Sequence, residues 1–351
     1  MKASTEFWSG KKVLLTGHTG FKGSWLTLML TELGAKVRGL SLNVMPKQLF
    51  ELANVALVAE HCIGDINDSE IIKSHIESFR PDIIFHMAAQ SLVSEGYLNP
   101  LETLNTNVMG TAKLLDAIKN WESPLAVVVV SSDKCYLPSN RNHSFVESDI
   151  LGGLDPYSCS KAACELIVNS YRASFFADST HLGIATARAG NVIGGGDYAA
   201  NRVIPDAMNA IIRKQPLVLR NPDAIRPWQH VLDALHGYLL LAEALFKQPE
   251  VYSGPWNFGP LAKDMLTVGE LVQRCYKQVG IPYFFETQQS IFKETNILLL
   301  DSSKARVELK WQPRWTLAQT IEKILEWYQG VANGANVRQL TQAQIHVYMN
   351  S

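Results

Sequence analysis

A tyrosine and a lysine one helical turn apart are the first residues of this chain that could do chemistry. Tyr157 and Lys161 belong to the run Tyr-Ser-Cys-Ser-Lys, and side chains four positions apart share one face of a helix. An ammonium beside a phenol stabilises the phenolate, so we expect the pKa of Tyr157 to fall from about 10 toward neutrality. Such a phenolate can act as a general base toward a hydroxyl group. Because the same spacing occurs by chance on many helix surfaces, the surrounding sequence must decide.

Polar residues also follow the most apolar run of the chain. Residues 126–131 contain four consecutive valines and are predicted to form a buried strand, which Ser132, Asp133 and Lys134 follow directly. The carboxyl ends of the strands in a parallel sheet face the ligand site. A serine and an aspartate can also simply cap a turn. Three polar groups after a buried strand nevertheless favour a reaction site.

Three glycines, Gly17, Gly20 and Gly23, lie between a predicted strand and a predicted helix. Glycines in this position allow a tight turn, a close approach of the backbone to a pyrophosphate, and close packing of the helix on the strand. The helix N-terminus adds N–H groups and a partial positive charge. The pattern therefore predicts a dinucleotide cofactor, although its spacing is GxxGxxG rather than GxGxxG. Lys22 either adds charge near the phosphates or is a solvated surface lysine.

The expected ribose position lacks the acidic residue that is usual in dinucleotide folds. An Asp or Glu normally follows the second strand and holds the ribose diol, whereas this chain has Ser41 and Asn43 there. These side chains can hydrogen-bond the hydroxyls more weakly, so we expect looser cofactor binding. Arg38 lies inside the predicted strand, which argues against a contact with a 2′-phosphate. Residues 65–66 suit the adenine side.

The elements that must position these groups alternate along the first half of the chain. Short apolar runs predict strands, and a period near 3.6 residues predicts helices. The predicted strands are residues 12–16, 36–40, 82–86, 126–131 and 182–188, and the predicted helices are residues 24–33, 69–79, 101–120 and 157–176. Apolar strands that alternate with helices indicate an α/β fold, here a doubly wound parallel sheet of the Rossmann type.

The alternation weakens after residue 188. Residues 1–188 are therefore predicted to form the cofactor-binding domain, and residues 189–351 a smaller C-terminal substrate-binding lobe. Residues 231–246 are expected to return to the first domain. Residues 256–259 are interpreted as packing between the two parts.

The composition excludes several classes of protein. The 351 residues carry a formal net charge of -1, with no block of lysine and arginine, which argues against a nucleic-acid partner. The apolar runs are too short to cross a membrane, and the first residues lack a signal-peptide core. The five cysteines form no CxxC pair and no zinc-like cluster, so we expect reduced thiols in the cytoplasm and no metal.

As a set, the motifs resemble those of the extended short-chain dehydrogenase/reductase family over nearly the whole chain. The motifs are the glycine turn of residues 17–23, His-Met-Ala-Ala-Gln at residues 86–90, Asn107, Ser132-Asp133, YxxxK from Tyr157, and Arg-Ala-Gly-Asn-Val at residues 188–192. Nucleotide-sugar 4,6-dehydratases of this family carry a glutamate where this chain has Lys134. That departure, with residues 17–25 and 226–231, is similar to the branch that acts on CDP-glucose.

The resemblance implies a reaction that uses NAD in three steps: oxidation at C4 of the sugar, loss of water across C5 and C6, and return of hydride to C6. Tyr157 would take the proton of the 4-hydroxyl with support from Lys161 and Ser132. Asp133 would protonate the departing 6-hydroxyl. Lys134 either is the base at C5 or only tunes Asp133. An epimerase eliminates no water and has no need of such a pair, so a dehydratase is favoured.

The resemblance also implies two sets of binding residues. The cofactor set is Gly17, His18, Gly20, Phe21, Lys22, Gly23, Ser41, Asp65, Ile66, Ala88, Ala89, Gln90, Asn107, Ser131, Tyr157 and Lys161. The substrate set is Asn191, Gly196, Arg202, Arg220 and Arg226. Arg202 and Arg226 are either phosphate ligands or partners in structural ion pairs.

By the same resemblance we expect a homodimer built on residues 101–120 and 157–176, or a tetramer. A role in making deoxysugars for lipopolysaccharide O-antigen is expected on the same ground. The alternatives are another nucleotide-sugar 4,6-dehydratase, a 4-epimerase, and an NAD-binding protein without enzymatic activity.

Overall fold

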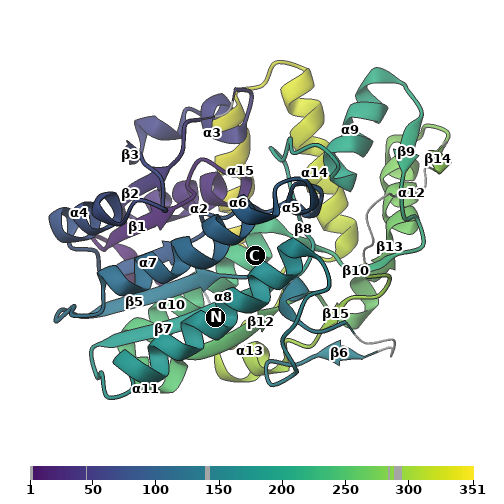
Figure 1. Ribbon diagram of the computed structural model, residues 1–351. Coiled ribbons are helices and arrows are strands. Elements are labelled where there is room, and N and C mark those ends of the chain that lie inside the picture. The colour runs from purple at the N-terminus through teal and green to yellow at the C-terminus, as the bar shows by residue number, and fades with distance from the viewer. Residues whose placement is uncertain (1–2, 45, 139–142, 284, 288–294) are drawn as a thin grey trace.

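A parallel sheet of seven strands forms the centre of the molecule (Figure 1). The structure is a computed structural model that describes residues 3–44, 46–138, 143–283, 285–287 and 295–351. The strands, in spatial order, are β12 (Gly254–Phe258), β7 (Leu182–Ala189), β5 (Leu125–Val130), β4 (Ile83–His86), β1 (Lys12–Thr16), β2 (Lys36–Ser41) and β3 (Glu60–Ile63). Each neighbouring pair is parallel. The chain starts inside the sheet with β1, adds β2 and β3 on one side, and then adds β4, β5, β7 and β12 on the other.

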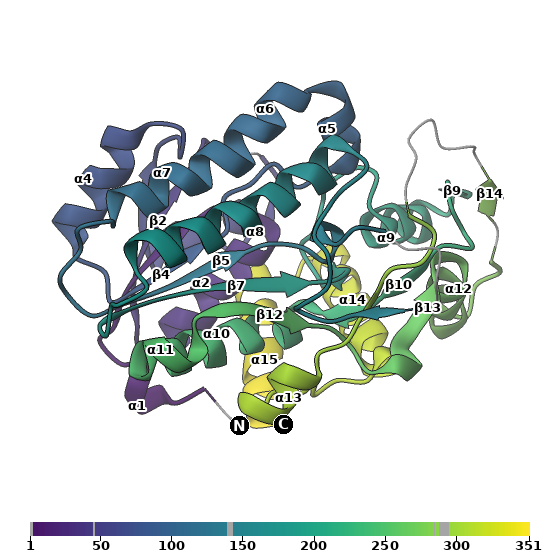
Figure 2. The ribbon, with the colours of Figure 1, turned by 60° about the horizontal axis from the view of Figure 1, so that its bottom comes forward.

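Helices cover both faces of the sheet, as Figure 2 shows. One face carries α4 (Ser69–Phe79), α7 (Gly110–Ala117) and α8 (Pro156–Phe175). The other carries α2 (Phe21–Glu32), α10 (Val231–Lys247) and α15 (Val337–Asn350). Because both faces are covered, β5 and β7 are buried along their whole length, and this explains why their sequences read as continuous apolar runs.

The predicted fold class is confirmed, and several predicted elements match closely. β1 and α4 begin and end at the predicted residues. The predicted helix 101–120 instead consists of α6 (Pro100–Leu104), a π-helical turn at Asn105–Met109, and α7. Strand β3 was not predicted, because its residues are only partly buried and lack an apolar run.

Two elements after residue 188 join the sheet layers. α10 packs against β5 and β7, and β12 pairs with β7 in parallel register. Residues 256–259, interpreted from the sequence as packing between the two parts, instead form the last three residues of this edge strand and the residue after it. Pro255 obscured this strand, and an edge position is where a sheet tolerates proline. The division into residues 1–188 and 189–351 stays a prediction.

The remaining elements are helices and short strand pairs outside the seven-stranded sheet. Helices there are α1 (Thr5–Trp8), α3 (Leu49–Leu52), α5 (Val93–Leu98), α9 (Val203–Arg213), α11 (Pro249–Tyr252), α12 (Val268–Val279), α13 (Ser303–Glu308) and α14 (Leu317–Ala332). Short strand pairs are β8 (Val192–Ile193) with β11 (Gln229–His230), β9 (Leu217–Leu219) with β14 (Phe285–Thr287), β10 (Ile225–Pro227) with β13 (Met265–Thr267), and β6 (Ser144–Phe145) with β15 (Leu299–Leu300).

Asp233 on α10 anchors the C-terminal helix in the core. Its Oδ1 accepts hydrogen bonds from the Tyr348 hydroxyl at 2.6 Å and from the Arg314 backbone N–H at 2.7 Å. Burial raises the pKa of this carboxyl to about 7, although the hydrogen bonds and the charge of Arg314 oppose the shift. Helices α10 and α15 are thus joined through a buried acid that titrates near neutrality.

This pKa predicts a pH-dependent stability. Unfolded, Asp233 ionises near pH 4, so between about pH 4 and 7 the folded state holds one more proton than the unfolded state. The free energy of unfolding therefore falls as the pH rises through this window, on the order of 1 kcal/mol per pH unit from this group. Asp233→Asn removes that component, so the stability of wild type relative to the variant should fall from about pH 5 to pH 7. Denaturant titrations measure it, and parallel pH curves for the two proteins would contradict it.

Candidate active site

The predicted catalytic loop lies directly after β5. Ser132 caps a 3-10 turn at Asp133–Cys135: its Oγ accepts a hydrogen bond from the Lys134 N–H at 3.2 Å and donates one to Asp133 Oδ1 at 3.1 Å. Tyr157 lies in the first turn of α8, where Asp155 caps the helix by accepting from the Ser158 N–H. The hydroxyl of Ser132 hydrogen-bonds the phenol of Tyr157. The structure therefore brings the loop and the tyrosine together.

The expected lowering of the Tyr157 pKa is wrong for the protein's own groups. Burial raises the pKa of this phenol to about 12, against the effect of its hydrogen bond with Ser132. The Lys161 ammonium lies 3.5 Å from the Val130 carbonyl oxygen, and burial lowers its own pKa, while the nearby Glu165 opposes that change. The i, i+4 spacing correctly placed the two residues on one buried helix face, but desolvation outweighs the charge of the lysine.

Asp133 is held as a buried acid. Burial raises the pKa of its carboxyl, and Lys134, Ser132 and Arg226 oppose the shift. Gly190, just after β7, makes room for it, because a Cβ at that position would lie 3.1 Å from Asp133 Oδ2. A carboxyl whose pKa is raised can stay protonated and donate a proton.

The glycine turn has the geometry of a dinucleotide cradle. Gly17 has a φ of +76°, and a Cβ there would lie 2.7 Å from the Ala88 nitrogen. A Cβ on Gly23 would lie 2.2 Å from the Gly17 carbonyl oxygen, so only glycine lets α2 pack this closely. Gly20 is the N-cap of α2 without a side-chain cap, which leaves the helix N-terminus able to receive an anion. These residues fit the pyrophosphate of a dinucleotide.

His18 packs between this turn and β2. It is buried, a Cβ on Gly39 would lie 2.1 Å from its ring, and its Nε2 is 2.7 Å from Nδ1 of His61. Burial and the neighbouring His61 lower the pKa of His18 to about 4. Ser41 lies beside the turn and accepts a hydrogen bond from the Thr19 N–H at 3.4 Å. His18 is thus a neutral packing residue between the turn and β2.

Other predicted cofactor residues have clear structural partners. Asn107 lies in the π-helical turn, where it accepts from the Gln90 N–H at 2.8 Å and donates to the Gln90 carbonyl and to Ser160 Oγ. It therefore ties the loop after β4 to α8, and π-turns are frequent at functional sites. Asp65 is exposed, and Ile66 is buried against Gly110. Ala89 and Ser131 lie at the same edge of the sheet, after β4 and β5.

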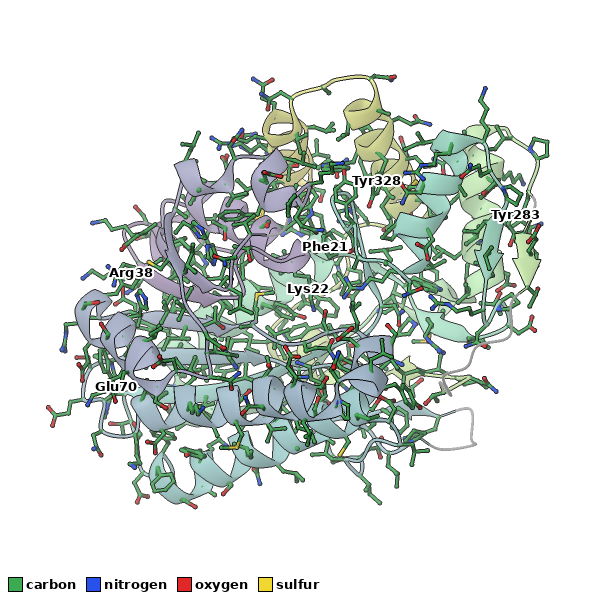
Figure 3. All side chains as sticks on the ribbon, turned by 45° about the horizontal axis from the view of Figure 1, so that its top comes forward. Phe21, Lys22, Arg38, Glu70, Tyr283 and Tyr328 are labelled. Atoms are coloured by element: carbon green, nitrogen blue, oxygen red, sulfur yellow. The ribbon has the colours of Figure 1, made fainter. Side chains whose placement is uncertain are left out.

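Phe21 and Lys22 lie at the start of α2, near the centre of the view in Figure 3, and both line the cleft. Burial lowers the pKa of Lys22 to about 8, and the charges of Lys161 and Arg202 lower it to a smaller extent. The alternative of a solvated surface lysine is therefore wrong. Lys22 is a desolvated cation in the same site as Asp133, whose charge opposes the shift.

A cleft of about 320 Å³ connects these groups to the smaller elements of the rim. Catalytic candidates at one end are Ser132, Asp133, Lys134 and Tyr157, and the predicted substrate residues that line it are Asn191, Arg202, Arg220 and Arg226. Gly196 is not among the lining residues. It forms a turn with a φ of +80° against Leu49.

The arginines that line the cleft also form hydrogen bonds within the protein. Arg202 donates to Asp197 Oδ2 and to Ser91 Oγ, both at 3.0 Å. Arg226 is buried and donates to the carbonyls of Ile225 and Asn296. Arg220 donates to the Asn201 carbonyl at 2.8 Å. Each guanidinium is held in place at the cleft wall.

Comparison with known proteins agrees with this site. Residues 14–324 match the family described as GDP-mannose 4,6 dehydratase. The chain is 42% identical, over 98% of both chains, to a CDP-glucose 4,6-dehydratase of Salmonella typhimurium. The chain belongs to the GDP-mannose 4,6-dehydratase family.

Solved structures share its fold. A UDP-glucose 4-epimerase of Thermotoga maritima with UDP-glucose has a TM-score of 0.81 at 21% identity and covers 92% of this chain and 99% of its own. A dTDP-glucose 4,6-dehydratase of Bacillus anthracis in complex with NAD has a TM-score of 0.78 at 22% identity, over 94% of this chain and 100% of its own. One fold thus serves both dehydratases and epimerases, so the chemistry must be argued from the site.

Sequence reasoning missed some residues of this 4,6-dehydratase family site. Residues 91–92 in the loop after β4, residues 93–94 at the start of α5, and Asp206 on α9 line the cleft. Their signal was weak, because short polar segments outside a motif look like ordinary surface. Among the described residues, no group of three or more His, Cys, Asp or Glu side chains could hold a metal, and no helix is long and apolar enough to span a membrane.

A methyl group at Gly190 should disturb this family site. In Gly190→Ala the new Cβ would lie 2.4 Å from Pro227 Cγ and 3.1 Å from Asp133 Oδ2, so the carboxyl or the neighbouring chain must move. Displacement of a reacting group by about 1 Å lowers turnover roughly 100-fold. Steady-state kinetics on a nucleotide-linked glucose would measure kcat, with melting temperature as the folding control. An unchanged kcat in a folded variant would contradict the close fit described here.

Proposed function

We propose that this protein converts CDP-D-glucose to CDP-4-dehydro-6-deoxy-D-glucose with loss of water. The observation that carries the proposal is the convergence of Tyr157, Ser132, Asp133 and Lys134 on one cleft beside a glycine turn. The 42% identity to a CDP-glucose 4,6-dehydratase over nearly the full length supports the choice of substrate.

NAD is the proposed cofactor, because the turn at Gly17, Gly20 and Gly23 fits a pyrophosphate and Ser41 stands where a ribose would lie. NAD, when bound, would supply the reversible hydride transfer by which C4 is oxidised and C6 is later reduced, with no net change in the cofactor. Tyr157 and Lys161 lie at the same edge of the sheet and would flank its reactive end. The relative solved with NAD has the same fold.

The side chains of the cleft can carry the proton transfers. Tyr157 takes the proton of the 4-hydroxyl, and Ser132, which hydrogen-bonds the phenol, steadies the 4-oxygen. Asp133 delivers a proton to the departing 6-hydroxyl, for which its buried, raised-pKa carboxyl is suited. Lys134 stands next to this acid and either accepts the C5 proton, and returns a proton to C5 when hydride reaches C6, or holds Asp133 in place.

This acid–base pair distinguishes a dehydratase from an epimerase. Epimerisation needs a base at the 4-hydroxyl but no acid for a leaving hydroxyl. A buried acid placed one residue from the serine that contacts Tyr157 would have no task in an epimerase. A binding protein without activity would have no need of the tyrosine and lysine together.

The diphosphate of the substrate would lie against Asn191 and the arginines of the cleft wall, Arg202, Arg220 and Arg226. A guanidinium can give two parallel hydrogen bonds to phosphate oxygens. Arg202 and Arg226 both lie near the reaction end, since the charge of Arg202 acts on Tyr157 and that of Arg226 acts on Asp133. We propose that the diphosphate lies beside Arg202.

We further propose a homodimer built on α6, α7 and α8, in the cytoplasm, with a role in deoxysugar synthesis for lipopolysaccharide O-antigen. Exposed apolar side chains support a covered face here: Leu101 on α6, Met109 in the π-helical turn between α6 and α7, and Leu166 on α8. Sedimentation of the purified protein tests this assembly.

The reaction is tested by incubating the protein with NAD and a panel of CDP-, UDP-, dTDP- and GDP-linked glucose. We expect a product lighter by one water from CDP-glucose, with the alkaline absorbance of a 4-keto-6-deoxy sugar. A product of unchanged mass would instead indicate an epimerase. Binding of NAD without turnover of any sugar would favour a binding protein.

Removing the phenol oxygen should abolish turnover. Tyr157→Phe keeps the ring and its packing but cannot take a proton, so kcat should fall at least about 1,000-fold. NAD binding, measured by fluorescence titration, should change little. Substantial residual activity would reject Tyr157 as the base.

Lys134→Ala should cripple elimination more than oxidation. If Lys134 is the base, its removal leaves the C5 proton without a nearby acceptor. If Lys134 only holds Asp133, its removal frees that acid to move. In either case turnover should fall roughly 100-fold. In single-turnover experiments the absorbance of reduced cofactor should then build up, because C4 oxidation outpaces loss of water. A variant with normal turnover would remove Lys134 from the mechanism.

A further inference from the structure

We infer that Asp206 on α9 reads the nucleotide base and selects cytosine over uracil and thymine. The inference rests on the proposed function only in so far as the substrate is a nucleotide-linked sugar. It names a side chain that would decide which nucleotide the cleft accepts.

Elimination among the acids of the cleft singles out Asp206. The described lining contains three acidic residues, Asp133, Asp197 and Asp206. Asp133 belongs to the reaction end, and Asp197 accepts hydrogen bonds from Arg202 and from the Ala199 N–H. Among the described residues, no donor hydrogen-bonds the Asp206 carboxylate. It therefore keeps its acceptor capacity for a ligand.

Asp206 lies beyond the diphosphate position as seen from the reaction site. Arg202 is the N-cap of α9, and Asp206 follows it by four residues, so the two share one face about 6 Å apart along the helix. The charge of Arg202 acts on Tyr157 and Lys22, whereas the charges that act on Asp206 are those of Arg220 and Asp197. In a nucleotide sugar bound with its sugar at Tyr157, the nucleoside end would lie near Asp206.

Apolar side chains beside Asp206 suit the faces of a base. Pro205, Val218, Leu219 and Val268 line this end of the cleft, and Val218 on β9 is 46% exposed there. α9 and β9 stand next to each other at the edge of the molecule farthest from α4 and β3 (Figure 1). A ring held between these side chains would present its polar edge to the carboxylate.

The chemistry of that edge separates the pyrimidines. Cytosine carries an amino donor at position 4, whereas uracil and thymine carry an oxygen acceptor there. An ionised carboxylate only accepts hydrogen bonds, and pairing of a carboxylate with the amino group of cytosine is an established mode of base recognition. Burial raises the pKa of Asp206, and Arg220 opposes this shift. The amino group of cytosine would donate a hydrogen bond in place of water that the carboxylate has lost. The carbonyl oxygen of uracil would face the carboxylate without a hydrogen bond between them.

The test compares binding of CDP and UDP by isothermal titration calorimetry to wild type and to Asp206→Asn. Wild type should bind CDP roughly 10- to 100-fold more tightly than UDP. An amide can present either a donor or an acceptor, so in Asp206→Asn the ratio should fall to about threefold or less. The ratio is the readout, because removing a negative charge near a diphosphate changes the affinities of both nucleotides alike.

Asp223→Asn is the matched control. Asp223 is an exposed acid in the loop between β9 and β10 and is not among the lining residues, so this variant removes the same charge nearby without touching the base. It should keep the wild-type ratio. Asp206→Leu, checked by its melting temperature, should weaken CDP more than UDP.

The outcomes separate this inference from the proposed reaction. If wild type binds UDP as well as CDP, or if Asp206→Asn keeps the wild-type ratio, the inference is overturned, even where CDP-glucose is dehydrated. If the ratio collapses as expected while CDP-glucose gives no dehydrated product, the base-reading role stands and the proposed reaction fails.

Discussion

A buried ion pair between Glu165 and Arg188 holds together the elements that build the cleft. Their atoms Oε2 and Nη2 lie 2.8 Å apart, and both side chains are 3% exposed. Arg188 also donates to the Tyr136 hydroxyl, which in turn donates to Asn257. Helix α8, strand β7, the chain just after the catalytic turn, and strand β12 therefore meet in one network. Such a pair is costly to bury, and removing one partner alone typically costs about 3–5 kcal/mol.

This network also explains how the two halves of the catalytic site keep their positions. Glu165 is on the same helix as Tyr157 and Lys161, two turns and one turn further along, and Tyr136 follows the Ser132–Asp133–Lys134 segment within a few residues. The loop after β5 is thus joined to α8 at two places, by the hydrogen bond between Ser132 and Tyr157 and by the network around the ion pair. The orientation of the acid toward the phenol depends on contacts outside the cleft.

The local parts of this arrangement were predictable from the sequence. The glycine turn, β1 and α4 follow from patterns that are contained in a few neighbouring residues, and the fold class follows from their alternation. Strands β3 and β12 were missed, because a partly exposed strand and an edge strand with a proline give no continuous apolar run. The network of Glu165 could not be predicted either, since its members lie far apart in the chain and are brought together only by the sheet.

The candidate site was predictable in its residues and less so in its electrostatics. Spacing placed Tyr157, Lys161, Ser132 and Asp133 at one edge, but it carries no information on how much water each group loses. Desolvation reversed the expected pKa shift of Tyr157 and turned Lys22 from an ambiguous lysine into a cleft residue. The role of Gly196 stays a prediction for a related reason, because a glycine needed for a left-handed turn looks the same in sequence as one needed for a ligand.

Burial moves the pKa values of the cleft in one common direction. It raises those of Tyr157 and Asp133 and lowers those of Lys22 and Lys161, so each group is pushed toward its neutral form. A phenol with a pKa of about 12 stays protonated at neutral pH, so the protein's own side chains do not hold Tyr157 as a phenolate. The base strength of Tyr157 must then come from charges that arrive with the reactants, because a positive charge placed beside a desolvated phenol acts through a low dielectric. Activation of the tyrosine is thereby coupled to occupancy of the site.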